Sequence, residues 1–446
     1  MSERIAITGA GMVTAAGIGL DACWETLTAG RSCVGSVSLW DATGMASQIA
    51  GEVPGSPDVP ERLGQYEIVG RPLSYAVSAA LEALQQAGLD GEINVPPGRR
   101  AVVAAGGFDD QMLPMMARGA DRIVPEGQHS FEGLDVDDLA VAMSSGGVLA
   151  EMARYSQVEL AQALAHHFGA RQVVTVSTAC AGGSTAIGDA MSMIRRGEAD
   201  IVLCVGVDTL ITREMMGGFC NLTALSTRND EPELASRPFD KDRDGFVMGE
   251  GAAAIVLERE SVARARGANV LAEMAGFGYS ADAYRLTAPH PAGTGMALAM
   301  ERAISDAGMQ PSDIDYVNAH GTSTAANDSA ESRAIHMVFA EHAPKLAVSG
   351  TKSVIGHLIH GAGAVGAAVA VKTLTEQLVH PTANYDTPDP ECDLDVVGGA
   401  PRSMAVGGVI VNAFGFGGQN ASLVLKRYPV EIEIPPASSH DAHGGI

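Results

Sequence analysis

Aromatic residues make up only 4% of this 446-residue chain, and basic residues are few, with 29 Lys and Arg against 53 Asp and Glu. Nucleic-acid binding needs clustered basic side chains and usually aromatic stacking platforms, so both scarcities argue against a nucleic-acid partner. The net charge of −24 also disfavours an anionic membrane surface. Because 46% of the residues are hydrophobic, the chain has ample material for a folded core, and disorder over most of its length is excluded.

Long apolar runs and paired cysteine motifs are missing as well. The segment 354–371 has no acidic residue or lysine, but it carries two histidines and several glycines, so we expect a buried helix and no membrane span. The first residues, MSERIAITGAG, show no secretory signal. The six cysteines include no CxxC, and no His/Cys group has zinc spacing, so we expect reduced thiols, a cytoplasmic protein and no metal.

Short apolar runs alternate with amphipathic stretches along the chain, which is typical of an α/β fold with buried strands. Similar stretches recur in the same order: the one around Gly88 resembles that around Gly308, and the one around Gly249 resembles that around Gly417. A third match joins the strand-turn segment that contains Cys180 to the one that contains Lys352. Three matches in the same order indicate a duplicated fold.

The repeats predict three regions. An N-terminal half spans residues 1–258 and contains extra, divergent residues at about 107–155, and a C-terminal half spans residues 259–428. The Pro-rich and polar residues 429–446 are expected to form a flexible tail.

Cys180 is the first candidate for chemistry. It follows the β-branched run VVTV and precedes a helix rich in Gly, Ala and Ser, so it is expected at a helix N-terminus, where the dipole favours a thiolate. An inert packing cysteine is the alternative.

Two histidines share this kind of position. His320, in NAHGTST, and His357, in TKSVIGH, each follow a strand and lie at a turn rich in small residues, as expected for residues in a cleft. Lys352 lies in the same turn as His357 and would need an acidic partner if buried, for which Glu331 or Asp328 are the candidates.

These motifs, TACAGG, NAHGTST, TKSVIGH and NAFGFGGQN, together resemble those of a β-ketoacyl-[acyl-carrier-protein] synthase. The type II elongating ketosynthases of fatty acid and polyketide synthesis are the most similar group, over about residues 3–427. The resemblance implies a thiolase-like duplicated fold of two similar halves in five αβαβα layers. It also implies a dimer, either a homodimer or a heterodimer with a chain-length-factor-like subunit, and an acyl carrier protein as partner.

The resemblance also implies roles for single residues. Cys180 would accept the acyl chain, and its N–H with that of Phe416 would form the oxyanion hole. His320 and His357 would stabilise the enolate left by decarboxylation of a malonyl thioester, with Lys352 paired to Glu331 and with Asp328 in support. The remaining implied positions are the pantetheine- and substrate-binding residues Thr322, Thr324, Phe219 and Phe414, and Phe416 as a gate. No metal or nicotinamide is implied, since the substrates are carried on phosphopantetheine.

The chain departs from the family pattern at several positions. His360 stands where the family has a glycine, and Gly366 replaces a buried glutamate. Glu67, Ile68 and Thr223 stand where basic docking residues are expected. The methionine-rich segment 107–155 suggests an adaptable cavity, with an ordinary interface loop as the alternative.

We therefore predict a decarboxylative condensing enzyme, an acyltransferase, of a specialised polyketide or polyene pathway. A housekeeping fatty-acid elongation synthase is the main alternative. A non-catalytic chain-length-factor-like subunit is disfavoured because it would lack Cys180. A thiolase or starter-type synthase is disfavoured because those use a cysteine or an asparagine in place of the second histidine, His357.

Overall fold

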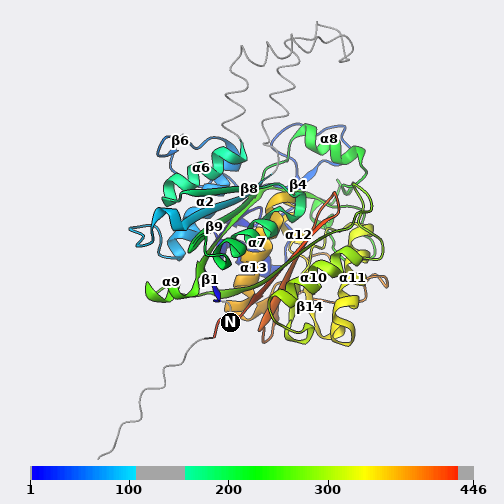
Figure 1. The fold of residues 1–446 in the computed structure, drawn as a ribbon. Helices are drawn as coiled ribbons and strands as arrows, with labels where there is room; N and C mark the ends of the chain where they lie inside the picture. The colour runs from blue at the N-terminus through cyan, green and yellow to red at the C-terminus, as the bar shows by residue number, and fades with distance from the viewer. Residues whose placement is uncertain (1–2, 107–155, 430–446) are drawn as a thin grey trace, which may run out of the picture.

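The computed structural model describes residues 3–106 and 156–429 (Figure 1). The expected insert at 107–155 lies outside these residues, and so does the expected tail except for its first residue, 429. None of the helices within the described ranges is long and apolar enough to cross a membrane.

A 12-stranded sheet runs through the protein. The order of its strands is β16-β14-β13-β18-β19-β12-β1-β11-β9-β7-β8, with the short β2 paired to β1. Their bounds are β1 (Ile5–Thr14), β2 (Gly17–Ile18), β7 (Arg100–Gly106), β8 (Gln172–Val176), β9 (Ile201–Asp208), β11 (Gly251–Arg259), β12 (Ala272–Ala281), β13 (Tyr316–Asn318), β14 (Ala347–Ser349), β16 (Asp395–Val396), β18 (Gly408–Phe414) and β19 (Gln419–Lys426).

Strand pairing repeats from one half of the chain to the other. In the first half β7 is parallel to β8 and β9, while β11 is antiparallel to β9 and β1. In the second half β13 is parallel to β14 and β18, while β19 is antiparallel to β18 and β12. The half-sheets join where β1 pairs with β12. This repeated topology confirms the duplicated fold; the exact division after residue 258 stays a prediction.

The helices form three layers around these half-sheets (Figure 1). α2 and α6 pack on the outer face of the first half-sheet, α10 on that of the second with α11 beside it, and α7 and α13 lie between the two half-sheets. The helices are α1 (Leu20–Ala29), α2 (Gly70–Gln86), α6 (Gln157–Phe168), α7 (Gly182–Arg195), α8 (Arg213–Asn221), α9 (Glu260–Ala265), α10 (Thr294–Asp306), α11 (Ala325–Phe339), α12 (Lys352–Ile355) and α13 (Ala362–Glu376). The expected five-layered αβαβα arrangement is thereby confirmed.

Small residues let the two central helices touch. A Cβ atom added to Gly183 would lie 2.4 Å from the backbone nitrogen of Ala364, and one added to Gly363 would lie 2.4 Å from that of Ser184. No real Cβ tolerates such a contact, so glycine is required at this crossing. The crossing lies at the N-terminal ends of α7 and α13, beside the turns that carry the candidate site.

Short strands complete the described structure. A small sheet consists of β10 (Met248–Gly249), β4 (Ile49–Gly51) and β3 (Gly35–Ser36), and two further sheets have two strands each. The pairs are β5 (Arg62–Leu63) with β6 (Tyr66–Glu67), and β15 (Leu378–Val379) with β17 (Arg402–Ser403). An isolated bridge between Met248 and His357 connects the first small sheet to the turn that carries one site histidine.

Candidate active site

Cys180 lies in a single 3-10 turn, η2 (Ala179–Ala181), between the end of β8 and the start of α7. Ala179 has a φ of 44°, so the backbone leaves the strand sharply before the helix begins. This is the strand-turn-helix placement that the sequence predicts. Cys180 is buried, at 5% exposure.

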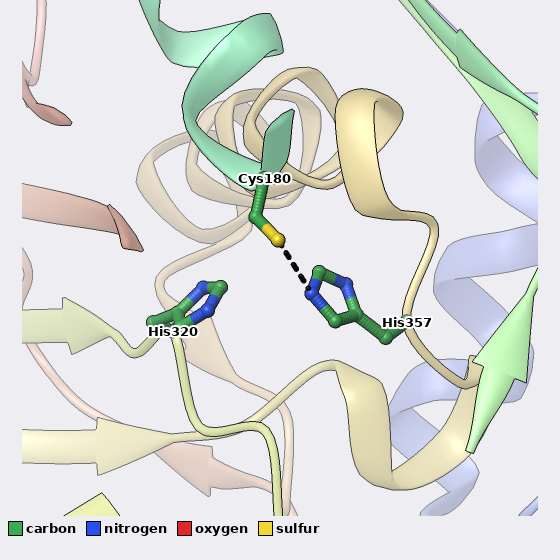
Figure 2. Close-up of side chains that lie close together, drawn as sticks. All are labelled: Cys180, His320 and His357. Atoms are coloured by element: carbon green, nitrogen blue, oxygen red, sulfur yellow. Dashed lines mark hydrogen bonds between the residues drawn. The ribbon is translucent and has the colours of Figure 1, made fainter. Parts of the chain in front are cut away.

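The two histidines approach from the second half of the chain. His320 follows β13, and His357 follows α12 through Gly356, whose φ of +74° demands glycine. Both side chains are buried. Figure 2 shows both rings directed toward the Cys180 sulphur from different segments.

The three side chains lie in contact range of one another. Nε2 of His357 is 3.2 Å from Sγ of Cys180, the contact dashed in Figure 2. The ring centroids of His320 and His357 are 5.3 Å apart, nearly perpendicular. The ligand atoms of all three residues fall within 4.8 Å of one another.

Backbone contacts determine the tautomer of His357. The Ile359 N–H donates to Nδ1 of His357 over 3.2 Å, so in the neutral ring the proton resides on Nε2, the nitrogen that faces Cys180. A metal bound to Nε2 would require the proton on Nδ1 and the loss of this bond. The trio therefore favours hydrogen-bond donation to a substrate oxygen over metal ligation.

Burial keeps both imidazoles neutral. Desolvation lowers the pKa of His320 well below its usual value, and the charge of Lys352 and the neighbouring His357 act in the same direction. Burial likewise lowers the pKa of His357, with smaller contributions from Lys352 and His360. Nδ1 of His320 is buried without a hydrogen-bond partner in the described structure. Two neutral rings thus face the sulphur.

The expected stabilised thiolate at Cys180 is wrong for this free site. Burial raises the pKa of the Cys180 thiol to about 11. Hydrogen bonding from the backbone N–H groups of Phe416 and of Cys180 itself, and the charge of Lys352, only partly offset that effect. Desolvation outweighs the helix N-terminus because the turn is enclosed by apolar side chains. The two N–H groups nevertheless converge on the sulphur, as the oxyanion-hole expectation requires.

Lys352 and Glu331 do not form the direct ion pair that we expected from the resemblance. Lys352 Nζ donates to the backbone oxygen of His320 over 2.6 Å. The carboxylate of Glu331 instead accepts the backbone N–H groups of His320 and Gly321, each over 2.8 Å. Backbone donors take up the carboxylate, so lysine and glutamate hold the His320 turn from two sides. Burial lowers the pKa of Lys352 to about 8, against the opposing charge of Glu331.

Asp328 supports the same turn. Its Oδ1 accepts the N–H of Thr322 over 3.0 Å, and its Oδ2 accepts the N–H of Phe239 over 2.8 Å. The Arg243 guanidinium lies 3.7 Å away and is itself buried. Asp328 thus contacts the turn and not Lys352. The sequence offered Glu331 and Asp328 as acidic partners for Lys352, and neither forms a direct ion pair with it among the described residues.

A cavity of about 320 Å³ opens beside the trio. Its wall includes Cys180, both histidines and the expected substrate-binding residues Thr322, Thr324, Phe414 and Phe416. The hydroxyls of Thr322 and Thr324 lie 2.9 Å apart at this wall. Phe219 is the exception: it is outside the wall and packs behind Phe416, with ring centroids 6.3 Å apart.

The wall also contains residues that the sequence did not single out. Phe246 contacts the His357 ring edge-on at 5.5 Å between centroids, and Ile359, Met296 and Leu222 add apolar surface. Phe246 lies in the motif DGFVMGEG, but nothing in its spacing relates it to His357. Of the positions where we expected basic docking residues, Thr223 reaches the cavity wall, with a φ of 51°, whereas Glu67 lies in β6.

The structure accommodates both departures from the family pattern. A Cβ on Gly366 would lie 2.6 Å from Cγ1 of Val411 and 2.9 Å from Oδ1 of Asn318, so neighbouring side chains occupy the space of a longer residue. His360 contacts Asp208, which is the last residue of β9.

The chain is similar to known proteins over most of its length. The family model "Beta-ketoacyl synthase, N-terminal domain" matches residues 2–263, and "Beta-ketoacyl synthase, C-terminal domain" matches residues 271–386. The 3-oxoacyl-[acyl-carrier-protein] synthase 2 of Synechocystis sp. is 39% identical over 96% of this chain and 98% of its own length.

Two solved structures have the same fold. One is a type II PKS acyl-carrier protein in complex with its ketosynthase bound to the hexaketide, which matches with a TM-score of 0.82 and 31% identity over 96% of this chain and 100% of that one. The other, the ishigamide ketosynthase/chain length factor, matches with a TM-score of 0.81 and 32% identity over the same shares of the two chains, 96% and 100%.

Proposed function

This chain belongs to the beta-ketoacyl synthase family, an acyltransferase family, and we propose that it condenses an acyl group held on Cys180 with a malonyl group held on an acyl carrier protein. The observation that carries the assignment of roles is the placement of one sulphur against two neutral imidazoles at the wall of one cavity. A thiol can hold an acyl group as a thioester, and two neutral donors can stabilise an enolate.

The first half-reaction transfers the acyl group to the enzyme. Cys180 loses its proton and its sulphur attacks the carbonyl carbon of the carrier thioester; the pantetheine sulphur leaves and takes up a proton. The N–H groups of Phe416 and Cys180, which converge on the sulphur, would bind the oxyanion that forms on the carbonyl oxygen. Each such donor contributes about 3 kcal/mol to transition-state stabilisation.

The second half-reaction forms the carbon–carbon bond. The malonyl thioester loses its carboxylate as CO2, and the electron pair of the broken bond becomes an enolate whose oxygen accepts hydrogen bonds from His320 and His357. The enolate carbon attacks the Cys180 thioester, the sulphur leaves and regains a proton, and the product is a β-ketoacyl thioester on the carrier. Neutral rings suit this role because Nε2–H of His357 can donate without first gaining a proton.

The substrates supply the driving force and the carrying group. Loss of CO2 drives the condensation, so the proposal needs neither a metal nor a nicotinamide. The solved relatives described above pair a ketosynthase with an acyl-carrier protein in one case and with a chain length factor in the other, which supports a carrier partner here. Both a homodimer and a heterodimer with a chain-length-factor-like subunit are compatible with the described residues.

We also propose that the enzyme serves a specialised polyketide or polyene pathway. Support comes from the departures at His360 and Gly366, from the acidic Glu67 where a basic docking residue was expected, and from similarity to a type II polyketide ketosynthase. The relative in Synechocystis supports the housekeeping alternative, fatty-acid elongation.

Covalent loading tests the assignment of the nucleophile. The protein is incubated with an acyl-carrier thioester, its intact mass is measured, and the adduct is mapped by peptide analysis. We expect one acyl group on Cys180. Cys204 is buried in β9 and Cys220 lies in α8 away from the cavity wall, so an adduct on either would overturn the assignment.

Competition between carriers tests the pathway. The enzyme receives equal amounts of a saturated acyl chain on a fatty-acid carrier and a polyketide-type acyl chain on its dedicated carrier. We expect preference for the second by at least about tenfold in kcat/KM. Equal, efficient extension of the saturated chain would assign the enzyme to fatty-acid elongation.

A further inference from the structure

His360 forms a partly buried contact outside the trio of Cys180, His320 and His357. It lies in the 3-10 turn η6 (Ile359–Gly361), three residues after His357. Oδ2 of Asp208 accepts the backbone N–H of His360 over 2.9 Å and contacts Nδ1 of the same residue over 2.8 Å. Because an ionised carboxylate only accepts, Nδ1 of His360 carries the proton. Asp208 is 3% exposed. Among the described residues, the Asp208 side chain accepts these two hydrogen bonds from His360 and no others.

The contact fixes a strained backbone. Ile359, directly before His360, has a φ of +37°, a conformation that is strained for an L-residue and least tolerated by β-branched side chains. Such a residue persists only where its surroundings hold it in place. Asp208 holds the next residue by both its main chain and its side chain, so it restrains the turn directly after the strained position.

This strained residue supplies the bond that determines the tautomer of His357. In the turn that Asp208 restrains, the Ile359 N–H points at Nδ1 of His357 and donates to it over 3.2 Å. Without that donor, Nδ1 could carry the ring proton, and Nε2 would face Cys180 as an acceptor. A ring of that tautomer could not donate to an enolate oxygen.

The same turn also contacts the nucleophile's segment. η6 packs against η2, the turn of Cys180, and a Cβ added to Gly182 would lie 3.4 Å from the His360 carbonyl oxygen. The clamp between His360 and Asp208 therefore joins the C-terminal end of β9 to both reacting turns, although the two residues are 152 positions apart in the chain.

We propose that His360 and Asp208 are positioning residues that hold the η6 turn so that His357 presents Nε2–H to the substrate. They act through the wall residue Ile359, and neither of them is itself among the residues of the cavity wall. The pair serves the decarboxylation half-reaction, because acyl transfer to Cys180 uses backbone donors that lie in other segments. This kinetic consequence rests on the proposed function; the effect on the His357 tautomer does not.

The test compares His360→Ala with His360→Asn. Asparagine carries its amide nitrogen where histidine carries Nδ1, so it can still donate to Asp208, whereas alanine cannot. Asp208→Ala removes the acceptor of both bonds from the other partner. His342→Ala is the matched control, because His342 is half-buried and bonds a backbone oxygen, that of Ile314, and neither residue is part of the cavity wall.

Three measurements are made on each full-length variant: single-turnover acylation of Cys180, CO2 release from a malonyl-carrier thioester, and ring ¹⁵N signals of histidine-labelled protein, with the His357 signals assigned by His357→Ala. For His360→Ala we expect acylation within about twofold of wild type, CO2 release lowered by roughly tenfold or more, and His357 signals shifted toward the Nδ1–H form. His360→Asn should recover CO2 release to within about threefold, and His342→Ala should leave all three readouts unchanged.

Two outcomes overturn the proposal: unchanged His357 signals in His360→Ala, or equal losses of acylation and decarboxylation that His360→Asn does not recover. If His360→Ala fails to fold, His360→Asn and Asp208→Ala decide, since the first keeps the contact and must keep the Nε2–H form, whereas the second loses the acceptor and must weaken that form. Absence of condensation in the wild-type protein would overturn the proposed function instead, and the ¹⁵N signals would still decide the positioning role.

Discussion

The backbone N–H of Ile359 lies 3.2 Å from Nδ1 of His357, and this one bond assigns opposite roles to the two nitrogens of the ring. Nδ1 accepts, so Nε2 must be the donor. It donates toward Cys180, and it can donate toward a substrate oxygen that binds there. The polarity of the site is thus built into its main chain before substrate arrives.

The histidines should be separable from the nucleophile by half-reaction. His320→Ala and His357→Ala are each expected to permit acylation of Cys180 while lowering malonyl decarboxylation at least ~100-fold, because each removes an enolate donor. The measurement is intact mass for the first step and CO2 release for the second. His336→Ala, which alters a half-buried histidine outside the cavity, serves as control. A folded variant that condenses at nearly the wild-type rate would show that its histidine is only structural.

The reactivity of Cys180 should rise with pH over an unusually wide range. Because burial raises the thiol pKa to about 11, the thiolate fraction increases about tenfold per pH unit across the neutral and mildly alkaline range. We expect the iodoacetamide alkylation rate to climb without a plateau between about pH 7 and pH 9. Mapping the adduct to Cys180, and its loss in Cys180→Ala, completes the measurement. A plateau below about pH 8 would contradict the raised pKa.

Lys352 should make the stability of the fold depend on pH. Burial lowers its pKa to about 8, below the 10.5 of an unfolded lysine, so between these values the unfolded chain binds more protons than the native one. Native stability therefore rises with pH across that window. Relative to Lys352→Met, the wild type should gain on the order of 2 kcal/mol in the free energy of unfolding from pH 8 to pH 10. Denaturant titrations of both proteins at each pH measure the difference, and parallel pH curves would refute the prediction.

The crossing of α7 and α13 should be intolerant of one added methyl group. In Gly363→Ala the new Cβ would lie 2.4 Å from the backbone nitrogen of Ser184, so the helices must separate. We expect the free energy of unfolding to fall by about 1–3 kcal/mol and condensation to weaken. Gly218→Ala is the matched control, since that helical glycine in α8 has open space around it and alanine favours helix. Equal effects of the two substitutions would show that close packing at the crossing is not the cause.

Local sequence predicts the parts of the site that depend on local geometry. The runs before Cys180 and His320 are strands, Cys180 lies in a turn that leads into a helix, and the repeats around Gly88 and Gly308 correspond to equivalent helices, α2 and α10, that end just before these glycines. Each of these features is determined by residues within a short window, which is why periodicity and turn chemistry identify them.

The contacts between segments distant in the chain could not be predicted from the sequence. Lys352 was expected to reach Glu331, yet it bonds the His320 carbonyl, because backbone donors already occupy the carboxylate. The Asp208–His360 contact joins two positions whose proximity depends on the whole sheet. Phe219 was expected at the substrate, yet it packs behind Phe416. Side-chain partners chosen by tertiary packing leave no periodic signal.

Cys180 and His357 come from different halves of the chain, yet close main-chain contacts at Gly183 and Gly363 set the spacing of the helices beside them. The spacing of the two turns thus depends on glycines that lie outside the cavity wall. Exchanges at wall positions such as Leu222 or Met296 can reshape the space for an acyl group while the reacting atoms stay in register. In a duplicated scaffold joined in this way, different residues determine the shape of the acyl space and the spacing of the reacting turns.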